Sequence, residues 1–96
     1  MGANQQLKRE LAGVLYRIQS QRLMEAFLDD LLSPREYRDL SKRLQIVKQL
    51  DRGVSQRAVA KNLRIGVATV ERGARELMDR SGGFRKILDR YYRKRK

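Results

Sequence analysis

Two short helical segments joined by a turn, over residues 55–73, carry the side chains whose types best fit a chemical role. The second segment begins with the small residues Val67, Ala68 and Thr69 and ends in a basic one. This layout is that of a helix-turn-helix, whose second helix enters the DNA major groove. Small side chains let a helix end approach base edges, and Thr69 offers both a hydroxyl and a methyl group. Nucleic-acid binding is therefore the first hypothesis, although ordinary packing would also explain Val67 and Ala68.

The charge of the chain points in the same direction. Its 96 residues include 23 Lys and Arg against 11 Asp and Glu, a formal net charge of +12 at pH 7. Basic side chains neutralise phosphates, so this excess is typical of nucleic-acid binders. A solvated basic surface without a particular partner is the alternative, because charge alone argues only for solubility and nonspecific attraction. The candidate phosphate or base contacts in and around the motif are Gln56, Arg57, Lys42, Lys61 and Arg64.

Cysteine and histidine are absent from the sequence. Disulfides and thiolate or imidazole zinc sites are therefore impossible, and Cys or His catalysis is excluded. We predict no metal, no prosthetic group and no catalytic residue; Asp29 and Asp30 are better explained as helix surface than as an acid–base pair. The sequence lacks a long apolar segment and a signal-peptide core, so we expect no membrane partner, which fits a cytoplasmic protein.

Apolar residues recur at helical spacing along the chain, and no strand pattern is found. We therefore predict an all-α chain of about six helices forming one DNA-binding domain over residues 1–96. Within it, residues 1–32 and 82–96 are expected to form dimerisation helices, 33–53 a central helix and 55–80 the helix-turn-helix. The expected individual helices cover residues 4–19, 21–32, 34–53, 55–63, 67–80 and 84 onward.

Local signals mark several helix ends. Ser33, Pro34 and Glu36 have the pattern of a capping box with proline at the first helical position. In the turn of the helix-turn-helix, many such motifs have glycine where this chain has Arg64, because the backbone there is left-handed. Since Gly66 comes two residues later, we expect this turn to be longer or looser than usual.

The apolar faces of the first, second and last expected helices exceed what a small helix-turn-helix can cover. A chain of this size buries only a modest core by itself. An interlocked helical homodimer would bury these faces, and a compact monomeric bundle is the alternative.

Five sequence elements together have the pattern of a known family. They are Leu32-Ser-Pro-Arg-Glu, Arg43-Leu-Gln-Ile-Val, Leu50-Asp-Arg-Gly, Ser55-Gln-Arg and Gly66-Val-Ala-Thr-Val-Glu-Arg-Gly73. Through these elements, residues 32–77 resemble the tryptophan repressor family. The resemblance implies a six-helix chain that forms an intertwined homodimer. It also implies a repressor whose hold on double-stranded operator DNA depends on a small corepressor, which is L-tryptophan in the type member.

The resemblance also implies roles for individual residues. Arg43 and Arg72 match two arginines that sandwich the indole ring, and Arg72 matches the group that pairs with the ligand carboxylate. Gly73 matches the position that leaves room beside the ring. Ser33 and the carbonyls near Leu32, from the other subunit, match the cap over the ligand amine. The positions that match the family's DNA-contacting residues are Gln56, Arg57, Gly66, Val67, Ala68 and Thr69.

Several residues depart from the family pattern. Glu76 stands where a serine is usual near the ligand amine, and a carboxylate there could bind an ammonium more strongly or repel phosphate and the ligand carboxylate. Glu71 replaces a small hydroxyl on the recognition helix, Ala60 replaces a lysine and Asp30 an apolar residue. We therefore expect the corepressor to be L-tryptophan or a related indole or aromatic acid. A ligand-independent helix-turn-helix DNA-binding protein is the alternative.

Overall fold

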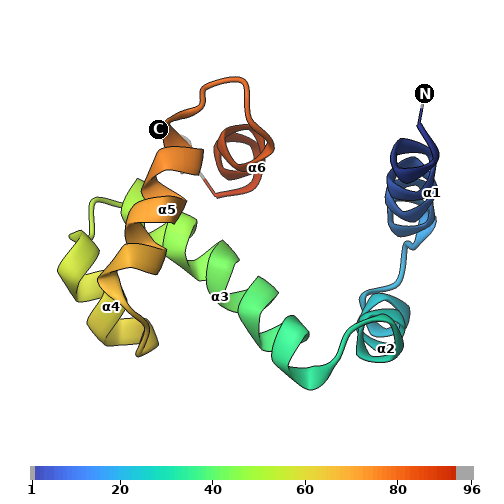
Figure 1. Ribbon diagram of the computed structural model, residues 1–96, viewed down its shortest axis with the longest axis horizontal. Helices are drawn as coiled ribbons and strands as arrows, with labels where there is room; N and C mark the ends of the chain where they lie inside the picture. Colours follow the sequence, from blue (N-terminus) through green and yellow to red (C-terminus); the bar gives the residue numbers. More distant parts are fainter. Residues whose placement is uncertain (1, 93–96) are drawn as a thin grey trace. The chain divides into compact units, whose positions relative to one another are not determined.

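The computed structural model describes residues 2–92, and over that range it contains six α-helices and no strand (Figure 1). The helices are α1 (Ala3–Arg17), α2 (Gln21–Leu31), α3 (Pro34–Asp51), α4 (Gln56–Leu63), α5 (Val67–Met78) and α6 (Gly83–Tyr91). The predicted all-α class is confirmed. The chain divides into two compact units, residues 1–37 and 38–96. No helix among residues 2–92 is both long and apolar enough to cross a membrane.

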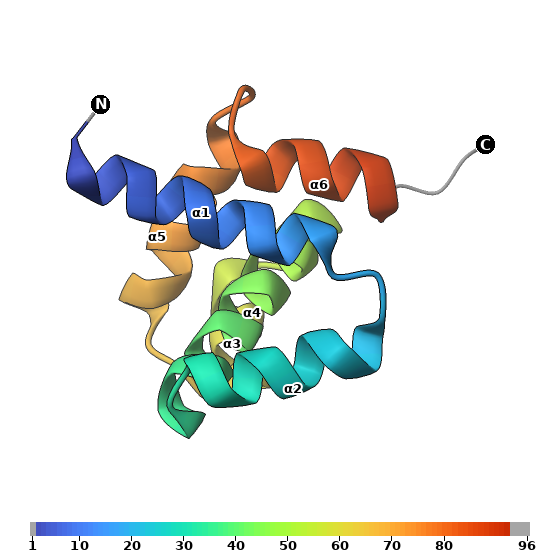
Figure 2. The same cartoon turned by 90° about the vertical axis from the view of Figure 1, so that its right-hand side faces the viewer.

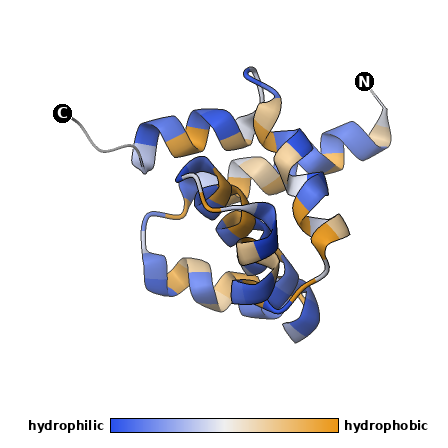
Figure 3. Cartoon of the chain, turned by 90° about the vertical axis from the view of Figure 1, so that its left-hand side faces the viewer, coloured by the Kyte–Doolittle hydropathy of each residue, from blue (hydrophilic) through white to orange (hydrophobic). Residues whose placement is uncertain are grey.

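The first unit holds α1, α2 and the first turn of α3. Neither α1 nor α2 buries a residue. Both helices are nevertheless amphipathic, and alternating hydrophilic and hydrophobic segments run along the ribbon in Figure 3. The large apolar side chains that this unit leaves exposed are Leu7, Leu11, Tyr16, Leu23 and Leu31.

The predicted capping box at the start of α3 is formed. The backbone N–H of Glu36 donates to Ser33 Oγ at 3.1 Å, and the backbone N–H of Ser33 donates to the Glu36 carboxylate at 2.8 Å. Each partner therefore satisfies a donor that the helix start would otherwise leave open. The hydrogen bond from the Ser33 backbone foremost, and then that from the Ser33 side chain, lower the pKa of Glu36 below its ordinary value.

The second unit is built around a buried cluster contributed by three helices. Ile46 of α3, Val59 and Ala60 of α4 and Val70 of α5 form its centre. Ala60 is small, which allows the close contact between α4 and α5 that the motif requires. The half-buried residues packed around this centre are Leu50, Val54, Leu63 and Ile65.

The turns on either side of α4 share one hydrogen-bond pattern. At the end of α3, Gly53 has φ +89° and the N–H of Val54 donates to the carbonyl of Gln49. At the end of α4, Arg64 takes the left-handed conformation with φ +56°, and the N–H of Ile65 donates to the carbonyl of Ala60. Both are Schellman motifs, in which a left-handed residue turns the chain out of the helix.

The expectation of a longer or looser turn in the helix-turn-helix is therefore wrong. Only residues 64–66 separate α4 from α5. Arg64 itself adopts the left-handed backbone that glycine usually supplies, whereas Gly66 has an ordinary φ of −73° and serves as the N-cap of α5.

Helix α5 ends at Met78, two residues before the predicted end at Arg80. The Asp79 carboxylate accepts hydrogen bonds from the backbone N–H of Ser81 at 3.1 Å and from its hydroxyl at 2.8 Å. Short polar side chains compete in this way with helical hydrogen bonds, and the chain turns away. The loop that follows leads into α6 (Figure 2). The basic tail, residues 93–96, lies outside the described residues.

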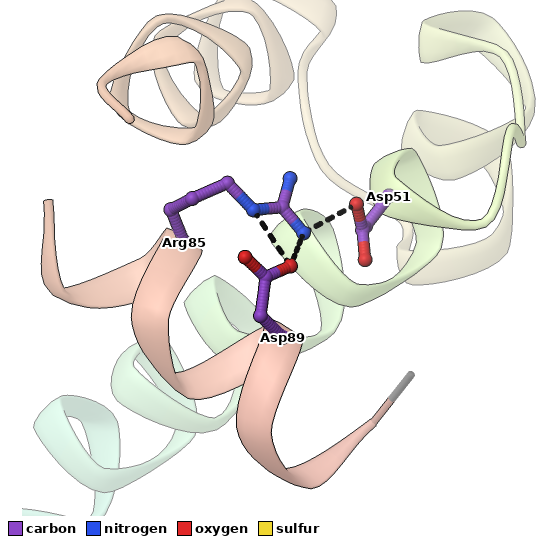
Figure 4. A network of polar contacts seen from close by, with 3 residues as sticks. All are labelled: Asp51, Arg85 and Asp89. Atoms are coloured by element: carbon purple, nitrogen blue, oxygen red, sulfur yellow. Dashed lines mark hydrogen bonds and ion pairs between the residues drawn. The ribbon is translucent and has the colours of Figure 1, made fainter. Parts of the chain in front are cut away.

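An ion-pair network joins α6 to the end of α3 (Figure 4). The Arg85 guanidinium lies 2.8 Å from a carboxylate oxygen of Asp51 and 2.8 Å from one of Asp89. These bonds, that to Asp51 foremost, raise the pKa of Arg85. The Arg85 and Asp51 side chains are only 17% and 15% exposed. Together with the buried Leu88, this network sets the position of α6 beside α3 and α5.

Candidate ligand pocket and nucleic-acid interface

A cavity of about 220 Å³ lies between α3 and α5 and is bordered on one side by α6. Its α3 residues are spaced at 0, 3 and 4 and its α5 residues at 0, 3, 4 and 7, so each helix presents a single face. The α3 and α5 lining residues are Arg43, Ile46, Val47, Thr69, Arg72, Gly73 and Glu76, and Phe84 adds the wall from α6.

At Gly73, α5 lies close to α3. A Cβ atom at this position would lie 2.5 Å from Cγ2 of Ile46 and 3.9 Å from Cγ1 of Val47. The first distance is far below van der Waals contact, so any larger residue would push the two helices apart or displace Ile46. Gly73 thus sets the width of the cavity in addition to lining it.

Three charged side chains border the cavity: Arg43, Arg72 and Glu76. Within residues 2–92 none of them forms a hydrogen bond or an ion pair through its side chain. Arg72 and Glu76 are one helical turn apart, but with the basic residue first, which is the less favourable order for such a pair. Two guanidinium groups and one carboxylate therefore border an otherwise largely apolar cavity and remain available to a ligand.

The structure brings together four of the six residues predicted for ligand binding, namely Arg43, Arg72, Gly73 and Glu76. Their role in binding a ligand stays a prediction. The other two, Ser33 and Leu32, belong to the first unit, where Ser33 caps α3. The resemblance assigns both to the partner subunit's side of the site, and this also stays a prediction.

Sequence reasoning missed three apolar walls of the cavity. Ile46 and Val47 follow Arg43 by three and four positions, so helical spacing alone could have placed them on the same face. Phe84 carried no such signal, because its position depends on how α6 packs. Thr69, predicted to contact DNA, also lines the cavity.

A second cavity, of about 250 Å³, adjoins the first and shares the walls Arg43, Ile46 and Thr69 with it. Its remaining walls are Asp39, Lys42 and Ile65, of which Lys42 was predicted from the sequence to contact nucleic acid. The two cavities thus lie on either side of Arg43, Ile46 and Thr69.

The first turn and a half of α5 carry most of the predicted DNA-contacting residues. Val70 is fully buried, whereas Val67, Ala68, Thr69 and Glu71 are exposed. Because Gly66 has no side chain and nothing lies within 4 Å of the position its Cβ would take, the start of the helix is open to approach. Of the candidates elsewhere in the unit, Gln56, Arg57, Lys61 and Arg64 are exposed and Lys42 is half-buried.

The geometry is thus a recognition helix with an exposed leading turn and a charged cavity behind it. The arrangement can place small and polar side chains in a groove and basic groups near phosphates. It can also hold a small ring-containing ion between α3 and α5, because guanidinium groups stack on aromatic rings and pair with carboxylates.

Comparisons with known proteins agree with this geometry. A family model described as Trp repressor protein matches residues 5–92. Proteins described as Trp operon repressor homologs are similar over 58 residues: that of Vibrio campbellii is 38% identical and that of Vibrio cholerae 41% identical. The aligned segment covers 59% of this chain and 58% and 56% of those two relatives, so it spans little more than half of their length. No solved structure gives a significant match.

Proposed function

This chain belongs to the Trp repressor family, and from that premise we propose that it is a DNA-binding transcriptional repressor gated by a small aromatic corepressor, L-tryptophan or a related indole or aromatic acid. The family is one of regulators and not of enzymes. The observation that carries the proposal is the cavity directly behind the recognition helix, bordered by Arg43 and Arg72. The proposed reading surface comprises Val67, Ala68 and Thr69, with phosphate contacts from the basic residues around it.

The gating mechanism follows from the shared position of the pocket and the recognition helix. A ligand held between α3 and α5 would contact both helices and so favour one placement of α5 over others. Only a difference in ligand affinity between the placements can shift their populations. A coupling of roughly 1–3 kcal/mol would change DNA affinity about 5- to 150-fold. Thr69, which lines the cavity and belongs to the exposed leading turn, lies at the junction of the two functions.

The proposed active form is a homodimer. The apolar side chains that α1, α2 and α6 leave exposed include Leu7 at 66%, Leu23 at 57% and Ile87 at 44%. A second copy of the chain would cover such faces, and a two-fold dimer would present two recognition helices to a two-fold symmetric operator. In solution the protein is expected to sediment as a dimer.

Titration with L-tryptophan tests the ligand. The chain contains no Trp, so the fluorescence of the ligand can be followed without protein tryptophan background. We expect saturable binding that Arg72→Leu abolishes without loss of helical circular dichroism. The matched control is Arg75→Leu, the same change at an exposed position of α5 outside the cavity, and it should leave ligand affinity unaltered.

DNA selection tests the gating. A random duplex library enriched on the protein with and without L-tryptophan should yield a defined sequence only, or far more strongly, with ligand present. Undiminished ligand affinity in Arg72→Leu would refute the pocket assignment. Equal enrichment in both conditions would instead support a ligand-independent DNA-binding protein.

A further inference from the structure

We propose that the Asp51–Arg85 ion pair is a positioning device for the α3–α5 cavity: by fastening α6 to the end of α3, it keeps Phe84 in place as a wall of the pocket. This inference rests on the proposed function, because it concerns the ligand that the cavity would hold. It goes beyond that function by making the affinity of the pocket depend on two residues that do not line it.

Helix α6 turns a single face toward the rest of its unit. Within residues 83–92, the side chains that are not exposed are Phe84, Arg85, Leu88 and Tyr92. Their spacing of 0, 1, 4 and 8 places them on one side of the helix. The wall residue and the ion-pair residue are therefore neighbours on the packed face, so a contact that holds Arg85 also limits the movement of Phe84.

The partner of Arg85 lies on the same side of α3 as the cavity. Val47 lines the cavity, and Asp51 follows it by one helical turn. The Arg85 guanidinium lies 2.8 Å from a carboxylate oxygen of Asp51, and both side chains are half-buried (Figure 4). Water and salt screen such a pair less than they screen an exposed one, so it can hold one helix against another.

A second contact joins the same two helices. The Lys48 ammonium lies 5.3 Å from the centre of the Tyr92 ring, within the range of a cation–π interaction. Lys48 precedes Asp51 by three positions, so both belong to one face of α3. The backbone of α6 packs against α5, and these long side chains tie it to α3. The ion pair holds the start of α6, which is where Phe84 lies.

Alanine substitutions at the two acids that bind Arg85 test the proposal. Asp51→Ala removes the bond between helices, and Asp89→Ala, with the same change in net charge, removes only the bond within α6. L-Tryptophan affinity, followed by ligand fluorescence without DNA, should fall about 3- to 10-fold in Asp51→Ala, as for residues that act on a site without touching its ligand. In Asp89→Ala it should change less than about 2-fold, because exposed ion pairs contribute little and Arg85 keeps its bond to α3.

A double-mutant cycle with Phe84→Ala shows whether the ion pair acts through the wall. In the Phe84→Ala background, Asp51→Ala should weaken L-tryptophan binding no further, because a side chain that is absent cannot be displaced. A purely structural role of Asp51 would lower the affinity by the same factor in both backgrounds. Helical circular dichroism accompanies each titration. Asp51→Asn, which keeps the shape of the side chain, replaces Asp51→Ala if that variant does not fold.

The outcomes separate this inference from the proposed function. Unchanged affinity in Asp51→Ala, with binding still lost in Arg72→Leu, would overturn the inference and leave the proposed function standing. An equal loss in the wild-type and Phe84→Ala backgrounds would do the same. Failure of the wild type to bind L-tryptophan would overturn both.

Discussion

The two units of this chain use amphipathic helices in opposite ways. In residues 38–96 the apolar faces of α3, α4, α5 and α6 supply every side chain that is buried in the described structure. In residues 1–37, α1 and α2 bury none, although Leu7 and Leu11 of α1 have the four-residue spacing that also marks the core helices. The difference teaches that apolar periodicity identifies a helix and its apolar face, but does not identify the segment that covers this face.

Replacing one leucine by alanine in each unit should give the largest difference, because one leucine lies in the core and the other on an exposed face. Leu88 of α6 is 1% exposed and Leu23 of α2 is 57% exposed. Leu88→Ala should lower the free energy of unfolding by about 2–5 kcal/mol, because it removes buried apolar atoms and leaves a cavity. Leu23→Ala should cost under about 1 kcal/mol within the chain and act mainly by weakening self-association. Urea denaturation and sedimentation, each at two protein concentrations, measure the two effects.

Equal losses of unfolding free energy in Leu88→Ala and Leu23→Ala, with unaltered self-association, would contradict this distinction between a core residue and an interface residue. Leu23 would then lie against its own chain. An effect of Leu23→Ala that grows as the protein is diluted would instead support the homodimer, because dilution favours dissociated chains.

Glycine substitutions sharpen the comparison at the level of the backbone. Gly13 of α1 and Gly73 of α5 are both inside helices, where alanine is intrinsically better by about 0.8–1 kcal/mol. A Cβ at Gly13 would meet only the Arg17 side chain, at 3.6 Å, whereas one at Gly73 would collide with Ile46. We expect Gly13→Ala to stabilise by roughly that amount and Gly73→Ala to destabilise, since overpacking costs about 1–3 kcal/mol.

Thermal unfolding of the two alanine variants checks this expectation. A gain in stability from both would mean that α5 can move away from α3 easily, and the cavity width would then not depend on Gly73. A loss in Gly73→Ala accompanied by weaker L-tryptophan binding would link the close helix contact to the pocket.

The local features of the fold were predictable because they depend on neighbouring residues. The Ser33–Glu36 capping box follows from side chains three positions apart, and the helix order follows from apolar spacing. The errors were local as well. Arg64 holds a left-handed backbone without glycine, and the Asp79 side chain ends α5 early by bonding Ser81. At Arg64 the backbone hydrogen bonds of the turn, and at Asp79 the side-chain hydrogen bonds to Ser81, outweighed the general preference.

The candidate site was predictable only in part, since it depends on contacts between distant segments. Arg43 and Arg72 were placed by resemblance, and the structure brings them to one cavity. Phe84 is a wall because α6 is held by the Arg85–Asp51 ion pair and by the burial of Leu88. No spacing within the sequence encodes that placement, so tertiary packing had to supply it.

The smallest expected difference is in how the unfolding free energy depends on pH. It concerns the N-terminal caps of α3 and α4. Glu36 belongs to a reciprocal capping box, whereas the Ser55 cap of α4 bonds the N–H of Ala58 and involves no acid. The pKa of Glu36 is lowered from 4.5, so the folded state favours its ionised form. The resulting stabilisation of the folded state is complete above pH 4.5. It is lost as the pH falls through the lowered pKa that Glu36 has in the folded state.

The measurement is the unfolding free energy of wild type and Glu36→Gln between about pH 7 and about pH 3. Glutamine keeps the geometry of the capping box without its charge, so the advantage of the wild type should shrink steadily on acidification. The cost of Ser55→Ala, about 0.5–2 kcal/mol, should stay constant over the same range because a hydroxyl does not titrate there. A difference in unfolding free energy between wild type and Glu36→Gln that does not change with pH would show that ionisation of Glu36 adds nothing to the capping box. Both helix starts would then be stabilised in the same way.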